Sequence, residues 1–212
     1  MQSKLYKLSE LFIIFIVIPV SFTLGYPIWV KLSIGVLGFL YIIFVLLKVE
    51  KNKFKIAPNL NWKAFWKQTL IHLSIIVVVT TCYVYITDKS QLFNVMLNNS
   101  KLWIFILFFY SLFSVYPQEL IYRTFFFQRY EALFKNKWLF ILVNAVLFSL
   151  AHIFFKNTLV MLLTFIGGIL FALTFERTKS TLLVSIEHAI YGCWLFTVGM
   201  GEMLAFPGME GA

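Results

Sequence analysis

The feature of this sequence that most constrains its fold is a series of long apolar runs. A helix that crosses a bilayer needs about 20 mostly apolar residues, with a range of about 17–25. Such runs lie at residues 8–25, 29–47, 67–87, 102–133, 138–155, 157–175 and 181–200, and the run 102–133 is longer than one span requires. The runs predict an all-α, polytopic bundle of about seven membrane-spanning helices.

Composition excludes an ordinary soluble domain. Of the 212 residues, 61% are hydrophobic and 13% are charged, whereas soluble domains carry about 45–50% apolar and about 25% charged residues. Lys4 and Lys7 precede the first run as they would in a signal peptide, but residues 21–26 lack a small-x-small cleavage site. We therefore expect the first run to be a transmembrane helix and residues 1–212 to form a single membrane-embedded domain.

The distribution of positive charge predicts an orientation. The formal net charge is +9, and the basic residues concentrate in residues 48–67, 135–137 and 177–179, whereas residues 88–100 hold one and the tail 201–212 holds none. Cytoplasmic loops collect Lys and Arg, so we expect the N-terminus inside the cell and the tail outside. This topology and the attraction of anionic lipid headgroups account for the charge, and we expect membrane lipid, not nucleic acid, as a partner.

Ionisable side chains inside spanning segments are costly and usually mark function. All three histidines of the chain lie in apolar runs: His72, His152 and His188. Glu119 and Glu187 are the acids that lie deepest in apolar sequence, and Arg123 follows Glu119 by four residues. That spacing places Arg123 on the same helical face as Glu119, where a structural salt bridge is the alternative to a catalytic role.

Spacing predicts which of these residues share a depth. The fourth and fifth runs should form an antiparallel hairpin that turns at residues 134–138. Glu119 lies 16 residues before the first lysine of this turn and His152 lies 15 residues after the second, so each is about 23 Å of helix from the turn. We therefore expect the two to lie level. His188 is about 13 Å of helix from the basic turn at residues 177–179. It can lie level with Glu119 and His152 only if helix tilt or the depth of that turn makes up the difference.

One carboxylate and two imidazoles at one depth suggest hydrolytic chemistry. A buried carboxylate can act as a general base near neutral pH, and an imidazole can share the proton transfer or donate to an oxyanion. Glu119, His152 and His188 also match a zinc ligand set, although the chain has no HExxH motif. His72 has no acidic companion in its own segment, and we interpret it as structural.

Three short motifs resemble a known family. Residues 118–123, Gln-Glu-Leu-Ile-Tyr-Arg, resemble the EExxxR motif of the CPBP intramembrane proteases, which include CAAX prenyl endopeptidases and bacteriocin-processing or immunity (Abi-like) proteins. Residues 148–152 match the family's FxxxH motif, and residues 188–192 are similar to its HxxxN motif. The resemblance marks residues 100–200 as a CPBP-protease-like core. It also implies an integral membrane protein, which we expect in the bacterial inner (plasma) membrane.

Two positions depart from the family pattern. Gln118 stands where the family has the glutamate taken as the water-activating base, and glutamine cannot accept a proton from water. Gly192 replaces the asparagine thought to help form the oxyanion site, and it has no side-chain donor. Asn144 is a candidate replacement donor, with an interhelical hydrogen bond as its alternative. Glu187 is a candidate second acid, but it points about 100° away from the histidine that follows it.

The resemblance implies an intramembrane endopeptidase that hydrolyses a peptide bond of a membrane-associated peptide or protein near the cytoplasmic leaflet. Glu119 would take a proton from a water that His152 positions, and His188 would stabilise the tetrahedral oxyanion. Arg123 would hold Glu119, and Gln118 would hydrogen-bond the scissile peptide. We expect no cofactor; if a metal is bound, the alternative is zinc held by Glu119, His152 and His188.

Two other classes of protein stay open from the sequence alone. A non-catalytic CPBP-like protein would keep the fold as an immunity, scaffold or sorting partner, and the departures at Gln118 and Gly192 favour it. A transporter would need broken helices at corresponding places in two halves. Pro117 is the one such break that we find in the sequence.

The lysine distribution gives a testable orientation. In a background with Cys82 and Cys193 changed to alanine, single cysteines within residues 51–55 should be protected in intact cells from a membrane-impermeant maleimide. Single cysteines within residues 91–98 should be labelled, because cytoplasmic loops collect Lys and Arg. Labelling of the first group in intact cells would refute the orientation.

Overall fold

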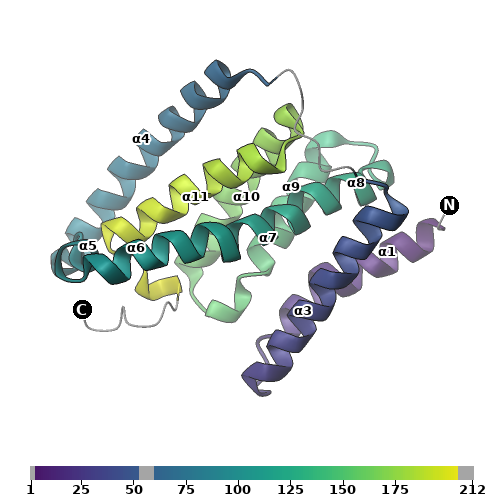
Figure 1. Ribbon diagram of the computed structural model, residues 1–212, viewed down its shortest axis with the longest axis horizontal. Helices are drawn as coiled ribbons and strands as arrows, with labels where there is room; N and C mark the ends of the chain where they lie inside the picture. The colour runs from purple at the N-terminus through teal and green to yellow at the C-terminus, as the bar shows by residue number, and fades with distance from the viewer. Residues whose placement is uncertain (1–2, 53–59, 205–212) are drawn as a thin grey trace. The chain divides into compact units, whose positions relative to one another are not determined.

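The fold is that of a helical membrane protein. A computed structural model describes residues 3–52 and 60–204, so parts of the basic connection 48–67 and of the tail 201–212 lie outside the described residues. The described residues form helices and no strand (Figure 1). The predicted all-α class is therefore confirmed.

Six helices among the described residues are long and apolar enough to cross a membrane. They are Ile28–Val49 (α3 with the π-helical turn η2), Trp62–Thr87 (α4), Ser100–Leu133 (α6 to η6), Lys137–Phe155 (α9 with η7), Thr158–Thr178 (α10) and Thr181–Val198 (α11). This agrees with the predicted polytopic bundle of about seven spans. The N-terminal helix, α1 (Lys4–Phe12) continued by η1 (Ile13–Val17) and α2 (Ile18–Ser21), is not among the six. Lys4, Lys7 and Glu10 place three charges in this short helix.

Asparagine marks the start of four of these helices. The side chains of Asn61, Asn99, Asn136 and Asn157 each accept a hydrogen bond from a backbone N–H in the first turn of α4, α6 (Ser100–Phe109), α9 (Lys137–Leu150) and α10, respectively. Such caps satisfy backbone donors that have no partner within the helix. Each cap therefore fixes the residue at which an apolar segment becomes helical.

The fourth run forms one continuous helix, as its length predicts. It consists of α6, η4 (Tyr110–Val115), α7 (Tyr116–Glu119), η5 (Leu120–Phe125), α8 (Phe126–Tyr130) and η6 (Glu131–Leu133). Pro117 cannot donate to the carbonyl four residues before it. The π-helical turn η4 directly precedes α7, and turns of this kind accommodate a changed hydrogen-bond spacing without ending the helix. The helix is thus unbroken at Pro117, which removes the observation that favoured a transporter.

The described chain divides into two compact units. The first unit comprises residues 1–56 and 118–181, and the second comprises residues 57–117 and 182–212. In the first unit, α9 and α10 approach closely at Gly168, where a Cβ atom would lie 3.0 Å from the Cα of Ala145. Small residues of this kind let two helix backbones pack tightly in a membrane.

A buried cluster of charges joins the N-terminal helix to the rest of the first unit. Arg129, on α8, is 1% exposed, and its Nε and Nη1 donate to Glu10 at 2.7 Å and Glu50 at 2.8 Å. The hydroxyl groups of Tyr130 and Tyr41 also donate to Glu10, at 3.0 and 2.5 Å. One arginine therefore ties α1, the end of α3–η2 and α8 together.

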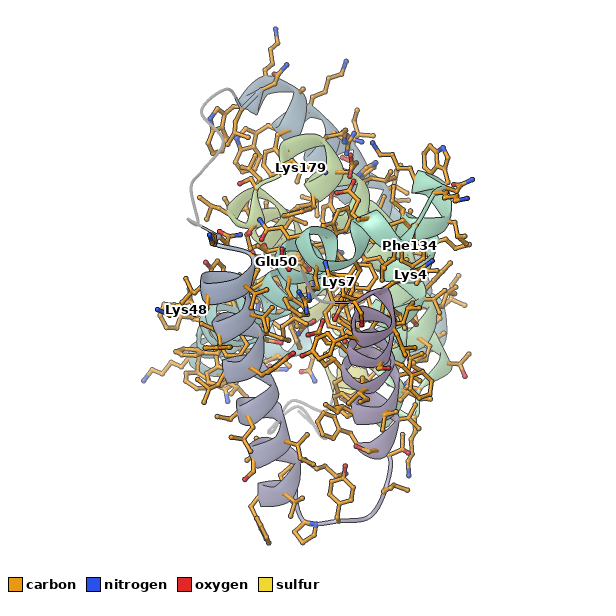
Figure 2. The ribbon with its side chains drawn as sticks, turned by 90° about the vertical axis from the view of Figure 1, so that its right-hand side faces the viewer. Lys4, Lys7, Lys48, Glu50, Phe134 and Lys179 are labelled. Atoms are coloured by element: carbon orange, nitrogen blue, oxygen red, sulfur yellow. The ribbon has the colours of Figure 1, made fainter. Side chains whose placement is uncertain are left out.

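Four lysines of the first unit lie toward one of its ends. Figure 2 shows Lys4, Lys7, Lys48 and Lys179 toward the same end as Glu50, whereas the turn between α2 and α3 lies at the opposite end. The positive-inside rule requires such a shared end if it faces the cytoplasm. The arrangement is consistent with the predicted orientation.

The Arg129 cluster predicts a large effect of Glu10 on stability. Glu10→Ala should lower the free energy of unfolding by about 3–5 kcal/mol, because it leaves a buried guanidinium without one of its two carboxylates. Thermal unfolding in detergent measures this change. Glu131→Ala is the matched control, because Glu131 is exposed and lies two residues after the arginine. Equal melting temperatures for the two variants would contradict the role given to the cluster.

Candidate active site

Glu119 and Arg123 form the salt bridge that the sequence analysis gave as the alternative to a catalytic role. Glu119 is the last residue of α7, and Arg123 lies one turn later in η5. Arg123 Nε lies 3.2 Å from Glu119 Oε2, and both side chains are 0% exposed. A carboxylate and a guanidinium that are both removed from solvent are stable only as a pair, because either charge alone would be costly to bury.

Further contacts fix the guanidinium of Arg123. Its Nη1 donates to Asn144 Oδ1 at 2.5 Å, and Asn144 Nδ2 donates to the backbone carbonyl of Tyr122 at 2.7 Å. The guanidinium also lies over the ring of Phe148, 4.8 Å from its centroid, and 5.9 Å from that of Phe171. Asn144 therefore makes the interhelical hydrogen bonds that were one of its two interpretations.

His152 lies just beyond the end of α9, between that helix and η7 (Ile153–Phe155). Its Nδ1 is 2.8 Å from the carbonyl oxygen of Phe148. A carbonyl oxygen only accepts hydrogen bonds, so Nδ1 carries the hydrogen and Nε2 of the neutral ring carries the lone pair. His152 is thus oriented to accept a proton or a hydrogen bond through Nε2.

The register of the first unit supports a shared depth for Glu119 and His152. Three contacts between the long helix and α9 define it: Phe126 with Phe140, Arg123 with Asn144, and Tyr122 with Phe148. Residue numbers fall along one helix as they rise along the other, so the pair is antiparallel, as the hairpin predicts. Continuing about one turn beyond the last contact reaches Glu119 on one helix and the region of His152 on the other.

His188 lies in the second unit, on α11. Its side chain is buried, and the ring of Tyr110 meets it edge-on, with centroids 6.0 Å apart and an interplanar angle of 81°. Gly192 follows one turn later on the same helical face. Gln118 and Glu119 lie in the first unit with His152, whereas His188 lies in the second, and the convergence of these residues in one site stays a prediction.

The second unit also pairs two residues that the sequence left apart. His72 Nδ1, on α4, lies 3.7 Å from Glu187 Oε1, on α11. The hydroxyl of Tyr191 is 2.9 Å from the same carboxylate oxygen and 3.2 Å from the carbonyl oxygen of Thr69. Glu187 therefore contributes to the contact between α4 and α11, which agrees with the structural interpretation of His72. Sequence spacing gave no signal for this pair, because its members lie far apart in the chain.

The fold and these side chains define an all-α, polytopic membrane protein with a buried carboxylate–guanidinium pair and histidines in its apolar helices. Residues 100–194 match the family model described as type II CAAX prenyl endopeptidase Rce1-like. The matched segment contains all three motifs, so the resemblance to the CPBP family is confirmed over this segment, and it supports a CAAX-type intramembrane protease. No curated protein and no solved structure matches the chain.

The contacts of Asn144 predict that this residue is needed for stability. Asn144→Leu removes a partner from Arg123 and from the Tyr122 carbonyl, and each buried polar group left unsatisfied costs about 1–3 kcal/mol. We expect the melting temperature in detergent to fall by several degrees, whereas Val146→Leu, an exposed position on the same helix, should leave it unchanged. An unchanged melting temperature for Asn144→Leu would show that Arg123 does not depend on α9.

Proposed function

We propose that this protein is an intramembrane endopeptidase that hydrolyses a peptide bond of a membrane-associated peptide or protein with a water molecule activated by Glu119. The observation that carries the proposal is the fully buried Glu119–Arg123 pair within the segment that matches the protease family. A buried ion pair in a membrane helix needs a reason to persist, since apolar residues of similar volume are often at least as stable. Activation of water is such a reason.

Each residue of the proposed site has a chemical task. Glu119 accepts a proton from water, and the guanidinium of Arg123, whose Nε lies 3.2 Å from Oε2, holds the carboxylate in place. His152 accepts a hydrogen bond from the same water through Nε2 and orients it. His188 donates to the oxyanion of the tetrahedral intermediate. Gln118 hydrogen-bonds the scissile peptide, because its amide cannot act as a base.

Arg123 also favours the metal-free route over zinc. A zinc ion bound by Glu119 would share that carboxylate with a permanent positive charge whose Nε lies 3.2 Å from Oε2. Two like unit charges at 4 Å repel by about 4 kcal/mol at an effective dielectric constant of 20. No acid other than Glu119 occurs in the first motif to act as the base if this residue became a metal ligand.

The motif departure at Gln118 favours the non-catalytic alternative. Gln118 occupies the position of the family's base, and a protein that only binds a membrane partner would not need a base there. The two functions differ in one measurable property, which is whether cleavage depends on Glu119.

We expect Glu119→Gln to abolish cleavage. Loss of a general base lowers turnover by about 10²–10⁴-fold, while the amide keeps the size and shape of the carboxylate. A proteomic comparison of membrane peptides from cells with the wild type and with Glu119→Gln should reveal a peptide that stays uncut in the variant. His152→Gln should have the same effect with the ion pair intact, and His72→Gln is the matched control that should retain cleavage. Identical peptide patterns for wild type and Glu119→Gln would reject the protease in favour of the non-catalytic protein.

We also expect cleavage by the purified protein to survive strong chelation, and elemental analysis to find no stoichiometric metal. The substrate for this assay is a synthetic peptide that spans the bond left uncut in Glu119→Gln cells. One zinc per chain, with cleavage lost on chelation and regained on adding zinc, would instead make Glu119, His152 and His188 metal ligands.

A further inference from the structure

The inference concerns what occupies the space at Gly192, one turn along α11 from His188. A Cβ atom built on Gly192 would overlap the hydroxyl oxygen and two ring carbons of Tyr110, at separations below the 3.0 Å that real Cβ atoms keep. The phenol end of Tyr110 therefore lies directly over the backbone of Gly192. Glycine is needed at this position, because any larger residue would collide with the tyrosine.

The ring of Tyr110 is held in this place by its surroundings. It packs edge-on against Phe196, with centroids 4.9 Å apart, and meets the ring of His188 edge-on on another side. Tyr110 belongs to a buried apolar cluster of the second unit with Val95, Ile106, Val115 and Phe196. Its phenol end therefore cannot swing away without disturbing packed neighbours.

The hydroxyl group of Tyr110 lies beside the face of α11 that carries His188. Residues 188 and 192 lie one turn apart on one face of α11, so a polar group above Gly192 lies on the face that presents His188. A tyrosine that is apolar at its ring and polar at its tip can bury the ring and keep a donor at the end. A phenol hydroxyl group can donate one hydrogen bond.

We propose that the hydroxyl group of Tyr110 is a second oxyanion donor, which acts together with His188 in the place that a side chain at position 192 would otherwise fill. This inference rests on the proposed protease function. In the reaction, water adds to the scissile carbonyl and its proton passes to Glu119, and the carbonyl oxygen becomes the oxyanion. Tyr110 donates a hydrogen bond to that oxygen and keeps its own proton throughout, so no bond to Tyr110 forms or breaks.

The test is Tyr110→Phe, measured on the reconstituted protein with the synthetic peptide that spans the bond left uncut in Glu119→Gln cells. Removal of one oxyanion donor lowers kcat by about 10²–10³-fold. KM and the melting temperature should stay as in the wild type, because the ring and its packing are kept and the donor acts on the transition state. Tyr116→Phe is the matched control, since Tyr116 is exposed on the same long helix, and it should retain wild-type kcat.

A double variant that moves the donor from position 110 to position 192 provides a second measurement. Tyr110→Ala removes both the donor and the obstruction, and adding Gly192→Asn then supplies a carboxamide donor from α11. The double variant should exceed Tyr110→Ala alone in kcat by at least tenfold. Equal kcat for these two variants would count against a donor at this position.

The outcomes separate this inference from the function on which it rests. A wild-type kcat for Tyr110→Phe, with Glu119→Gln inactive, would overturn the role of Tyr110 and leave the protease standing. Cleavage that persists in Glu119→Gln would reject the proposed mechanism itself. A large loss of kcat in both variants, with Tyr116→Phe active, supports both.

Discussion

A charged side chain inside a membrane has to find its partners within the protein, and the candidate site depends on how Arg123 does so. Its guanidinium is completely buried and meets the carboxylate of Glu119, the amide oxygen of Asn144 and the ring of Phe148. Lipid offers no polar alternative to these contacts. They therefore fix the rotation of the long helix and the packing of α9 against it, and they hold the carboxylate of Glu119 in one place.

The need of a buried charge for partners within the protein also explains the position of the N-terminal helix, which the family match does not cover. The N-terminal helix carries Glu10 in apolar sequence, and this acid is stable there because Arg129 and two tyrosine hydroxyl groups surround it. Arg129 lies within the matched residues 100–194, whereas Glu10 and Glu50 lie before them. The first helices of the chain are thus attached to the matched segment by buried charge as well as by apolar packing. If one carboxylate is removed from such a cluster, the desolvation of the buried guanidinium is no longer fully compensated, and the fold is destabilised.

Local features were predictable from the sequence, and contacts between distant segments were not. The spans followed from run length, because bilayer thickness sets how many apolar residues a helix needs. The Glu119–Arg123 pair followed from its spacing of four, and the register of His152 followed from a short turn of known position. By contrast, Tyr110 meets Gly192 and His72 meets Glu187 only because α6–η4 and α4 pack against α11, and no periodicity within one segment encodes such neighbours. The depth of His188 stays a prediction, because helix tilt decides it and tilt is set by packing.

The two departures from the family motifs, Gly192 and Gln118, have different consequences for the proposed site. At position 192 the missing side chain is matched by an occupant, since the phenol of Tyr110 fills the space and brings a hydrogen-bond donor of its own. At position 118 no such exchange is required, because Glu119 follows at once and has Arg123 to support its charge. Residues 118 and 119 point about 100° apart round the helix, and it is Glu119 that lies one turn before Arg123 and pairs with it. The glutamine thus leaves Glu119 as the acid that Arg123 serves.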